Sequence, residues 1–296
     1  MDGVGIEEPR ARRIQLPERG GAMAILEFGP PDRPIDIVFS HANGFNARTY
    51  RTILAPLASD RRILALDLRG HGRTELPTPT EGRTSWEGLA EDLLALLAAL
   101  DVRGAVLSGH SMGGTSSLLA AAQAPERLKA LVLFDPVLLP PGSSEAYRQG
   151  LAPPSAMEIA ARRRRAVFES REEALAAYTG RGAFKSWSPA QLADYVADGF
   201  RERPDGQVEL SCAREWEASN FGSHGHDPWP ALRAPPCPVR ILRAEHASTS
   251  ASLTPHLTQL EKAGLRIETI PGTTHFMPME RPDVVRAALS EAASAA

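Results

Sequence analysis

The fold is decided by the stretch Gly109-His110-Ser111-Met112-Gly113, in which a serine stands between two glycines. The apolar run ending at Ser108 predicts a strand, and the small residues that follow, 114–123, predict a helix. A turn this sharp strains the backbone at the serine. Bulky residues two positions before or after the serine would collide with the neighbouring strand and helix. The stretch therefore has the pattern of a nucleophile elbow, which lifts a hydroxyl above the edge of a sheet.

The same turn favours binding of negative charge. The amide of Met112 would lie at the N-terminus of the predicted helix, where the backbone carries partial positive charge. A hydroxyl and an amide placed together in this way suit an oxyanion that develops during acyl transfer. The alternative interpretation is a glycine-rich turn between a strand and a helix with an incidental serine.

The segments around this turn alternate between strands and helices. Short runs rich in Val, Ile and Leu predict strands at 23–28, 35–40, 62–66, 105–108 and 130–134. A leucine-rich helix is expected from about residue 85 to residue 100. Nearly continuous apolarity along the strands indicates that both faces of the sheet are covered. The chain is therefore predicted to be α/β, with a mostly parallel, doubly wound sheet.

The alternation stops after Phe134, where a cluster of prolines and glycine at 136–142 breaks regular structure. The following stretch reads as helical and polar, with no strand run. Strand patterns return at 239–243 and 265–270, and a last helix is expected at about 282–293. We therefore expect a core of residues 1–138 and 231–296, and a helical insertion of residues 139–230 that covers the site as a lid.

Composition limits the classes of protein that this chain can be. Its 296 residues are 43% hydrophobic and 23% charged with a net charge of −3, which is ordinary globular usage and offers no basic surface for nucleic acid. No apolar run approaches the roughly 20 residues that span a bilayer. Residues 1–13 lack the apolar part of a secretory signal, and Cys212 and Cys237 are expected to be free thiols. We expect a cytoplasmic protein that binds neither nucleic acid nor membrane, in an oligomeric state that the sequence leaves open.

Three further motifs accompany the elbow. Residues 40–45 read Ser-His-Ala-Asn-Gly-Phe, residues 67–73 read Asp-Leu-Arg-Gly-His-Gly-Arg, and residues 271–276 read Pro-Gly-Thr-Thr-His-Phe. With the elbow, they make the chain resemble the α/β-hydrolase superfamily. The first is similar to the oxyanion loop of that superfamily, with Ala42 in place of the usual glycine. The second is similar to the Asp-x-Arg-Gly-His-Gly turn, and the third to the Gly-x-x-His segment that carries the catalytic histidine.

The resemblance implies an α/β-hydrolase fold with a helical cap inserted after the sixth strand. It implies a serine hydrolase without a cofactor, in which Ser111 is the nucleophile and His275 is the base that activates it. The amides of Asn43 and Met112 would form the oxyanion hole.

The acid of the catalytic triad is missing from its usual position. Many relatives read Gly-x-x-Asp after the strand equivalent to 239–243, whereas this chain reads Ala-Glu-His-Ala at 244–247. Without an acid the imidazole loses its orientation and the stabilisation of its charged form. Two carboxylates could replace it, namely Asp135 at the end of strand 130–134 and Glu245, two residues before Ala247. We favour Asp135, although an aspartate there can also serve only to cap the loop.

Other clusters have simpler interpretations. The stretch 224–227, His-Gly-His-Asp, resembles metal-ligand spacing, but no further ligand cluster accompanies it, and we interpret it as a loop without a metal. The arginines at 162–165 lie among glutamates, which favours a solvated helix face over an anion-binding patch. Trp187, Trp216 and Trp229 fall in the insertion, where they are expected to pack on the core or to line an apolar pocket.

The predicted function is hydrolysis of an ester-like carbonyl through a Ser-His-Asp triad and an acyl-enzyme. A carboxylesterase is the default, and lactones, thioesters, amides and carbon–carbon bonds remain open. The substrate would be a small molecule with an apolar acyl or aryl group. One alternative is a ligand-binding or signalling protein on a hydrolase scaffold, which the alanine at position 247 keeps open. Another is a cofactor-free perhydrolase with the same triad.

Overall fold

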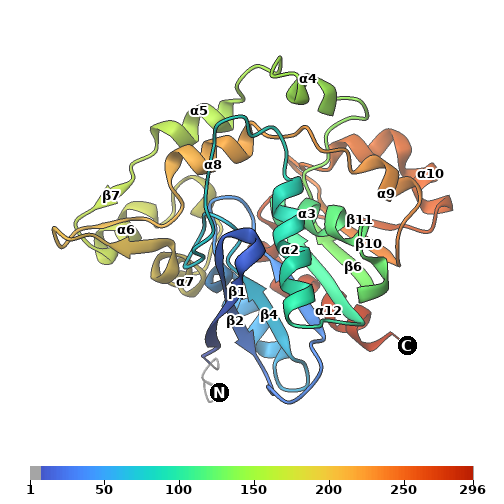
Figure 1. The fold of residues 1–296 in the computed structure, drawn as a ribbon, viewed down its shortest axis with the longest axis horizontal. Coiled ribbons are helices and arrows are strands. Elements are labelled where there is room, and N and C mark those ends of the chain that lie inside the picture. The colour runs from blue at the N-terminus through green and yellow to red at the C-terminus, as the bar shows by residue number, and fades with distance from the viewer. Residues whose placement is uncertain (1–7, 296) are drawn as a thin grey trace.

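The computed structural model describes residues 8–295, and Figure 1 shows a central sheet with helices on both faces. The sheet has eight strands in the order β1-β2-β4-β3-β5-β6-β10-β11. They are β1 (Arg10–Leu16), β2 (Gly21–Phe28), β3 (Ile37–Ser40), β4 (Ile63–Leu66), β5 (Ala105–His110), β6 (Leu128–Phe134), β10 (Val239–Ala244) and β11 (Arg266–Ile270). Only β2 runs antiparallel to its neighbours β1 and β4, which confirms the mostly parallel, doubly wound sheet.

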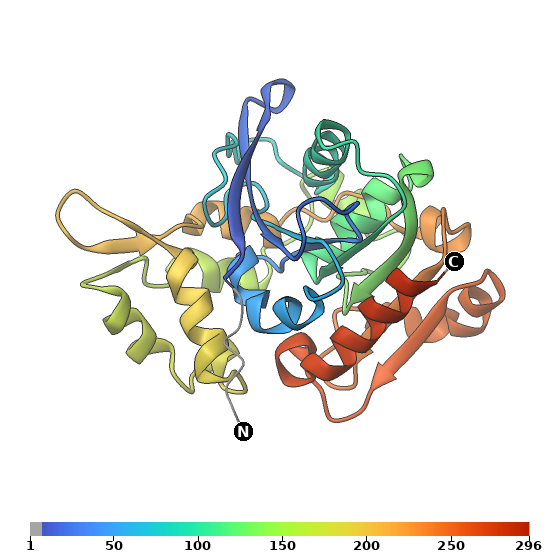
Figure 2. The same ribbon diagram turned by 90° about the horizontal axis from the view of Figure 1, so that it is seen from below.

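Both faces of the sheet are buried, as the apolar strands predict. In β3, Val38 packs into the cluster beneath α2 (Glu87–Ala99) and α3 (Met112–Ala121), whereas Ile37 and Phe39 pack into the cluster on the opposite face. Successive side chains of a strand point to opposite faces, so an unbroken apolar run satisfies both layers. On that opposite face α12 (Pro282–Ser294) lies beside α1 (Arg51–Leu54), as Figure 2 shows.

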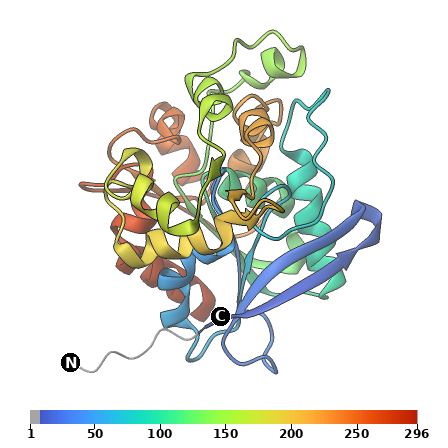
Figure 3. The same cartoon turned by 90° about the vertical axis from the view of Figure 1, so that its left-hand side faces the viewer.

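The first strand was not expected from the sequence. It reads Arg-Ala-Arg-Arg-Ile-Gln-Leu, and most of its residues are exposed because it forms the edge of the sheet. With β2 it makes a hairpin that projects from the sheet (Figure 3), and Gly20 turns between the two strands with a φ of 82°. A polar edge strand gives no apolar run, so the sequence pattern for a buried strand is absent here.

Residues 139–230 connect β6 to β10, which are neighbours in the sheet, and they lie above one end of the sheet in Figure 1. Their helices are α4 (Ser144–Arg148), α5 (Ala156–Arg163), α6 (Arg171–Tyr178), α7 (Pro189–Gly199) and α8 (Arg214–Phe221), with α9 (Trp229–Arg233) at the return to the core. The expectation of no strand in this segment is wrong. A small antiparallel sheet contains β7 (Val167–Phe168), β9 (Val208–Leu210) and β8 (Phe200–Glu202), which are too short to produce a periodic signal.

The last part of the chain completes the core with β10, α10 (Leu257–Lys262), β11, α11 (Met277–Glu280) and α12. Pro282 is the first residue of α12, a position that suits proline because its missing N–H has no partner within the helix. Cys212 and Cys237 are free thiols, as expected. Among residues 8–295, no helix combines the length and apolarity that a membrane crossing requires.

Candidate functional site

Ser111 occupies the turn between β5 and α3 by itself. The strand ends at His110 and the helix begins at Met112, and the serine has a φ of 55° and a ψ of −122°. A Cβ added to Gly109 would lie 2.5 Å from the carbonyl carbon of Gly113, so no larger residue fits there. The strained, positive φ of a non-glycine residue at this turn agrees with the elbow predicted from the sequence.

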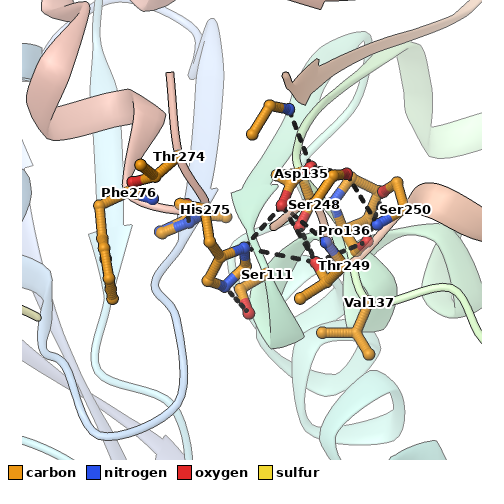
Figure 4. Close-up of polar contacts among 12 residues, drawn as sticks. Ser111, Asp135, Pro136, Val137, Ser248, Thr249, Ser250, Thr274, His275 and Phe276 are labelled. Carbon is orange, nitrogen blue, oxygen red and sulfur yellow. Dashed lines mark hydrogen bonds and ion pairs between the residues drawn. The ribbon is translucent and has the colours of Figure 1, made fainter. Parts of the chain in front are cut away.

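His275 reaches the serine from the loop that follows β11. Its Nε2 lies 3.0 Å from Ser111 Oγ, within hydrogen-bond distance, as Figure 4 shows. Both strands are parallel members of one sheet, so their carboxyl ends bring the two loops to the same edge. The structure therefore brings together the predicted nucleophile and the predicted base.

Asp135 follows β6 directly and contacts the other nitrogen of the imidazole. The distance from His275 Nδ1 to Asp135 Oδ2 is 2.6 Å, and the Asp135 side chain is fully buried. A carboxylate oxygen can only accept, so Nδ1 carries the proton in this contact. Nε2 is then left unprotonated and can accept the proton of the Ser111 hydroxyl.

The carboxylate of Asp135 is surrounded by hydrogen-bond donors from the segment that follows β10. Oδ1 accepts from Ser248 Oγ at 2.5 Å and from the amide of Ala244 at 3.0 Å, while Oδ2 accepts from the amide of Thr249 at 3.0 Å. Burial alone would raise the pKa of this carboxyl, but the hydrogen bond and charge of His275, together with these donors, hold the pKa below its usual value. Asp135 is therefore kept ionised and fixed in direction.

Glu245, the other candidate acid, is bound elsewhere. Its Oε2 accepts a hydrogen bond of 2.8 Å from the amide of Gly272. Ala247, which stands at the usual aspartate position, has a φ of 51°. The chain turns at this left-handed residue, and Ser248 and Thr249 follow it into contact with Asp135 (Figure 4).

Ser248 and Thr249 were not singled out from the sequence. The signal that could have found them is the pair of hydroxyl side chains directly after the alanine that replaces the usual acid. A loop that no longer carries a carboxylate can still bind one with hydroxyl and amide groups. Because Asp135 is more than a hundred residues away along the chain, that interpretation needs the strand order of the sheet.

The oxyanion loop lies against the elbow. A Cβ added to Gly113 would lie 2.4 Å from the carbonyl oxygen of Ser40, so the start of α3 packs directly on the end of β3. Within residues 8–295, the backbone amides of Asn43 and Met112 donate no hydrogen bond to another protein group. Both amides are therefore free to donate, as the residues of the predicted oxyanion hole must be.

The Asn43 side chain connects this loop to α8. Its Nδ2 donates to the carbonyl of Glu217 at 3.0 Å, and its Oδ1 accepts from Asn220 Nδ2 at 2.7 Å. On the other side, His71 Nε2 accepts from the amide of Gly44 at 3.0 Å. Burial lowers the pKa of His71 to about 4, so the imidazole is neutral and able to accept. The loop is thus fixed both by the core and by the segment at 139–230.

His110 precedes Ser111, and both of its ring nitrogens contact groups of other segments. Its Nε2 lies 2.8 Å from the carbonyl oxygen of His275, and its Nδ1 lies 2.8 Å from the hydroxyl of Tyr50. Since a carbonyl can only accept, Nε2 donates, and Nδ1 accepts from Tyr50, whose oxygen in turn accepts from the amide of Ala42 at 3.2 Å. Burial, together with the charge of His275, lowers the pKa of His110 to about 3. One neutral imidazole therefore joins the histidine loop to the oxyanion loop.

Aromatic side chains lie next to these loops. The ring of Phe45 has its centroid 5.0 Å from that of Trp187, 5.8 Å from that of Tyr195 and 6.3 Å from that of Phe276. Phe276 follows the base directly, so the surroundings of His275 are apolar on this side. Trp229, the last tryptophan of the 139–230 segment, is also buried, and its Nε1 donates to the backbone of that segment.

The arginines at 162–165 do not all lie on a solvated face. Arg162 and Arg165 pair with exposed or partly exposed glutamates, as expected. Arg164 departs from the expectation: its Nη1 pairs with Glu217 at 2.7 Å, and its Nη2 donates to the hydroxyl of Tyr195 at 3.1 Å. The prediction was wrong for this residue because α7 and α8, which are distant in sequence, close over it.

The His-Gly-His-Asp stretch packs against an aromatic side chain. The rings of His224 and His226 each have their centroid 4.8 Å from the ring of Trp86, and His226 Nδ1 accepts from the amide of Trp86 at 3.3 Å. Among the residues that the structure describes, no three His, Cys, Asp or Glu side chains are grouped as metal ligands. The two imidazoles therefore belong to the packing between this stretch and the start of α2.

Relatives share either the whole length or one part of this chain. The 2-(acetamidomethylene)succinate hydrolase of Mesorhizobium japonicum is 25% identical over 256 residues, which are 86% of each chain. The dihydrolipoyllysine-residue acetyltransferase component of the acetoin cleaving system of Pseudomonas putida is 38% identical over 114 residues, and the match covers 38% of this chain and only 30% of that protein.

Solved structures give the same fold. A crystal structure of E-2-(acetamidomethylene)succinate hydrolase superposes with a TM-score of 0.81 at 22% identity, covering 97% of this chain and 100% of the other. A thioesterase domain from the curacin biosynthetic pathway superposes with a TM-score of 0.73 at 17% identity, covering 96% and 100%. The family model described as the alpha/beta hydrolase family matches residues 37–288, from β3 to within α12. The chain is therefore an enzyme of the α/β-hydrolase family.

Proposed function

We propose that this enzyme is a serine hydrolase that cleaves an ester-like carbonyl with Ser111, His275 and Asp135. One observation carries the proposal: Ser111 Oγ lies 3.0 Å from His275 Nε2, while His275 Nδ1 lies 2.6 Å from Asp135 Oδ2. A serine hydroxyl is a weak nucleophile until a base removes its proton, and a base needs an acid to orient it. These three side chains fill the three roles in the required order.

The reaction would proceed in two halves. His275 Nε2 takes the proton as Ser111 Oγ bonds to the carbonyl carbon, and the charge of Asp135 stabilises the imidazolium. The carbonyl oxygen becomes an oxyanion held by the amides of Asn43 and Met112. When the carbon–oxygen bond to the leaving group breaks, His275 returns the proton to that group, and the acyl-enzyme remains. Water then attacks in the same way, with His275 as base, and releases the acid and free Ser111.

Carboxylic esters with an apolar acyl or aryl group are the proposed substrates. The aromatic side chain of Phe276 beside His275, with Phe45 stacked on it, supports an apolar substrate. Lactones, thioesters, amides and carbon–carbon bonds can be cleaved by the same groups. The segment at 139–230 would act as the cap that covers the substrate, and the core of 1–138 and 231–296 would carry the catalytic groups, in a cytoplasmic enzyme without a cofactor.

The ligand-binding alternative rested on the alanine at position 247. The contact between His275 and Asp135 supplies an acid from another position, so this reason no longer favours a protein without catalysis. The two functions still differ in a measurable way, because a binding protein would hold an aryl ester without hydrolysing it.

A short-chain p-nitrophenyl ester and a fluorophosphonate probe test the proposal. Ser111→Ala is expected to lower kcat by at least about a thousandfold, since removing a triad member leaves only oxyanion-hole and binding effects. Ser116→Ala is the matched control, because this serine lies one turn further along α3 and its buried hydroxyl has no hydrogen-bond partner within residues 8–295. Mass mapping should place the phosphonate on Ser111.

Two outcomes would contradict the proposal. One is a turnover by the Ser111→Ala variant that equals the wild-type value, or a phosphonate on another residue. The other is saturable binding of the ester by the wild type with negligible turnover, which would favour the ligand-binding protein.

A further inference from the structure

A cavity lined by none of the triad residues lies at the junction of the 139–230 segment and the core. Its volume is about 370 Å³, within the range of small-molecule sites. One wall is Trp216 of α8, and the others come from the connection between β4 and α2, from the start of α2 and from the β1–β2 turn. The cavity is lined by Arg19, Arg69, Pro79, Glu81, Gly82, Arg83, Thr84, Ser85, Gly88, Leu89 and Trp216, none of which belongs to the triad or to the proposed oxyanion hole.

Two of the three arginines in this cavity already have carboxylate partners. Arg19 pairs with Asp92 at 2.6 Å and with Glu91 at 2.9 Å. Arg69 pairs with the same Asp92, through its Nη2 at 2.5 Å and its Nε at 2.7 Å. The carboxylates of α2 therefore neutralise their charges. These two arginines line the cavity but provide no free positive charge.

Arg83 differs from both. Its Nη1 donates to Ser219 Oγ at 3.0 Å, and its guanidinium carbon lies 4.2 Å from the centroid of the Trp216 ring. Its Nη2 is buried and has no hydrogen-bond partner, and among residues 8–295 no carboxylate lies within 4.0 Å of this side chain. Burial, with a contribution from the charge of Arg69, lowers the pKa of Arg83 to about 10.

A partly buried guanidinium without a counter-ion is unfavourable, because the desolvation of its charge is not offset by an ion pair. Arginine at this place is difficult to explain by stability alone, since a neutral side chain could pack on Trp216 without that penalty. The planar fork of a guanidinium matches the oxygens of a carboxylate or phosphate group. The missing partner of Arg83 therefore has the chemistry of such an anion.

We propose that this cavity is a binding site for a small organic anion whose carboxylate or phosphate group pairs with Arg83. Leu89, Pro79 and the edge of Trp216 line the same space, so they can contact an apolar part of the ligand. The site would hold a ligand separate from the substrate of Ser111, between α8 and the core. It does not depend on the proposed hydrolysis.

Calorimetric titration of the Ser111→Ala variant tests the site without turnover. Benzoate and inorganic phosphate are the two probes, which separate carboxylate from phosphate recognition. At least one is expected to bind at one site, and Arg83→Gln in the same background should weaken that binding at least tenfold, whereas Arg83→Lys should keep only part of it, because the charge remains but the planar fork is lost. Arg163→Gln is the matched control, since it removes an equal charge from an exposed position of α5.

The ligand-free protein gives a second readout. Arg83→Met should raise the unfolding midpoint by about 2 °C, because a buried charge without a partner is replaced by an apolar chain that still packs on Trp216. The proposal is wrong if the Kd of each probe is above about 10 mM, because binding that weak does not identify a site. It is also wrong if binding survives in Arg83→Gln, or if Arg83→Met lowers the midpoint.

Discussion

The loops after β6 and β10 leave the same edge of the sheet and contribute opposite halves of one contact. The loop after β6 provides the carboxylate of Asp135, and the loop after β10 provides the groups that donate to it, from Ala244, Ser248 and Thr249. In many relatives the second loop would carry the acid itself. The difference teaches that a carboxylate can reach Nδ1 of the histidine from the loop after β6 when the loop after β10 carries none.

Both loops adopt an unusual backbone at the contact. Asp135 has a φ of 42° and Ala247 a φ of 51°, a left-handed conformation that costs roughly 1 kcal/mol or more for a residue with a Cβ. The hydrogen bonds between the loops offset that strain, since each one joins the carboxylate or backbone of the first loop to the second. The position of the Asp135 carboxylate thus depends on both loops together.

The largest expected effect comes from comparing one variant in the loop after β6 with one in the loop after β10. Asp135→Asn should lower kcat by about ten-thousandfold, because an amide can hold the imidazole in the wrong tautomer and cannot stabilise its charge. Glu245→Gln should leave kcat within about twofold of the wild-type value, since Glu245 binds the amide of Gly272 instead. Steady-state kinetics with a p-nitrophenyl ester, and circular dichroism to verify the fold, measure both. Near-normal turnover in the first variant with loss in the second would reverse the assignment.

Moving the acid to the other loop is the next test. Adding Ala247→Asp to Asp135→Asn should recover about tenfold in kcat, because the new carboxylate starts from the position that relatives use and aspartate tolerates a left-handed backbone. Adding Ala247→Asn is the control, since it has the same shape without the charge. If the two double variants are equally inactive, a carboxylate at position 247 cannot reach His275 from the loop after β10.

Removing one donor should have a smaller effect. Ser248→Ala deletes the 2.5 Å hydrogen bond to Asp135 Oδ1 and should lower kcat by roughly tenfold with KM unchanged, because hydrogen bonds to charged groups contribute about 1.5–3 kcal/mol. Ser252→Ala is the matched control, as its hydroxyl donates to the backbone of Leu138 outside this contact. Equal kinetics in both variants would show that the loop after β10 does not hold the acid in its working position.

The smallest expected effect is on stability. The pKa of Asp135 is lower in the folded protein than the ordinary aspartate value of 3.8, so ionisation of this group stabilises the fold above that value, and the contribution is lost as pH falls through the folded pKa. The free energy of unfolding that Asp135→Asn removes should therefore be larger at pH 7 than near pH 3. Urea titrations of wild type and variant at both pH values measure the difference. A cost that does not change with pH would mean that ionisation of Asp135 adds no stability.

Local patterns were sufficient to predict the core of the fold. The strands β3 to β6 are apolar on both faces, and the elbow at Ser111 combines glycines that only a tight turn requires. Where one face is solvated, as in β1, or where a strand has only two or three residues, as in β7 to β9, the same patterns contain no signal. These elements form because neighbouring segments supply hydrogen-bond partners.

The candidate site shows the same division. Ser111, His275 and the preferred acid Asp135 could be named from motifs and from the order of strands. The roles of Ser248, Thr249 and Tyr50 could not, because each depends on contacts with groups that lie far away in the sequence. A local pattern cannot report which distant residues close over a side chain.

The hydrogen bonds of His110 and Tyr50 have a consequence for redesign of this enzyme. The loops that hold His275 and Ala42 share one imidazole and one phenol, and both side chains are fully buried. A library that reshapes one of these loops to accept bulkier substrates will therefore disturb the other through the protein interior. Designers who keep both side chains fixed can vary the pocket while preserving the alignment on which turnover depends.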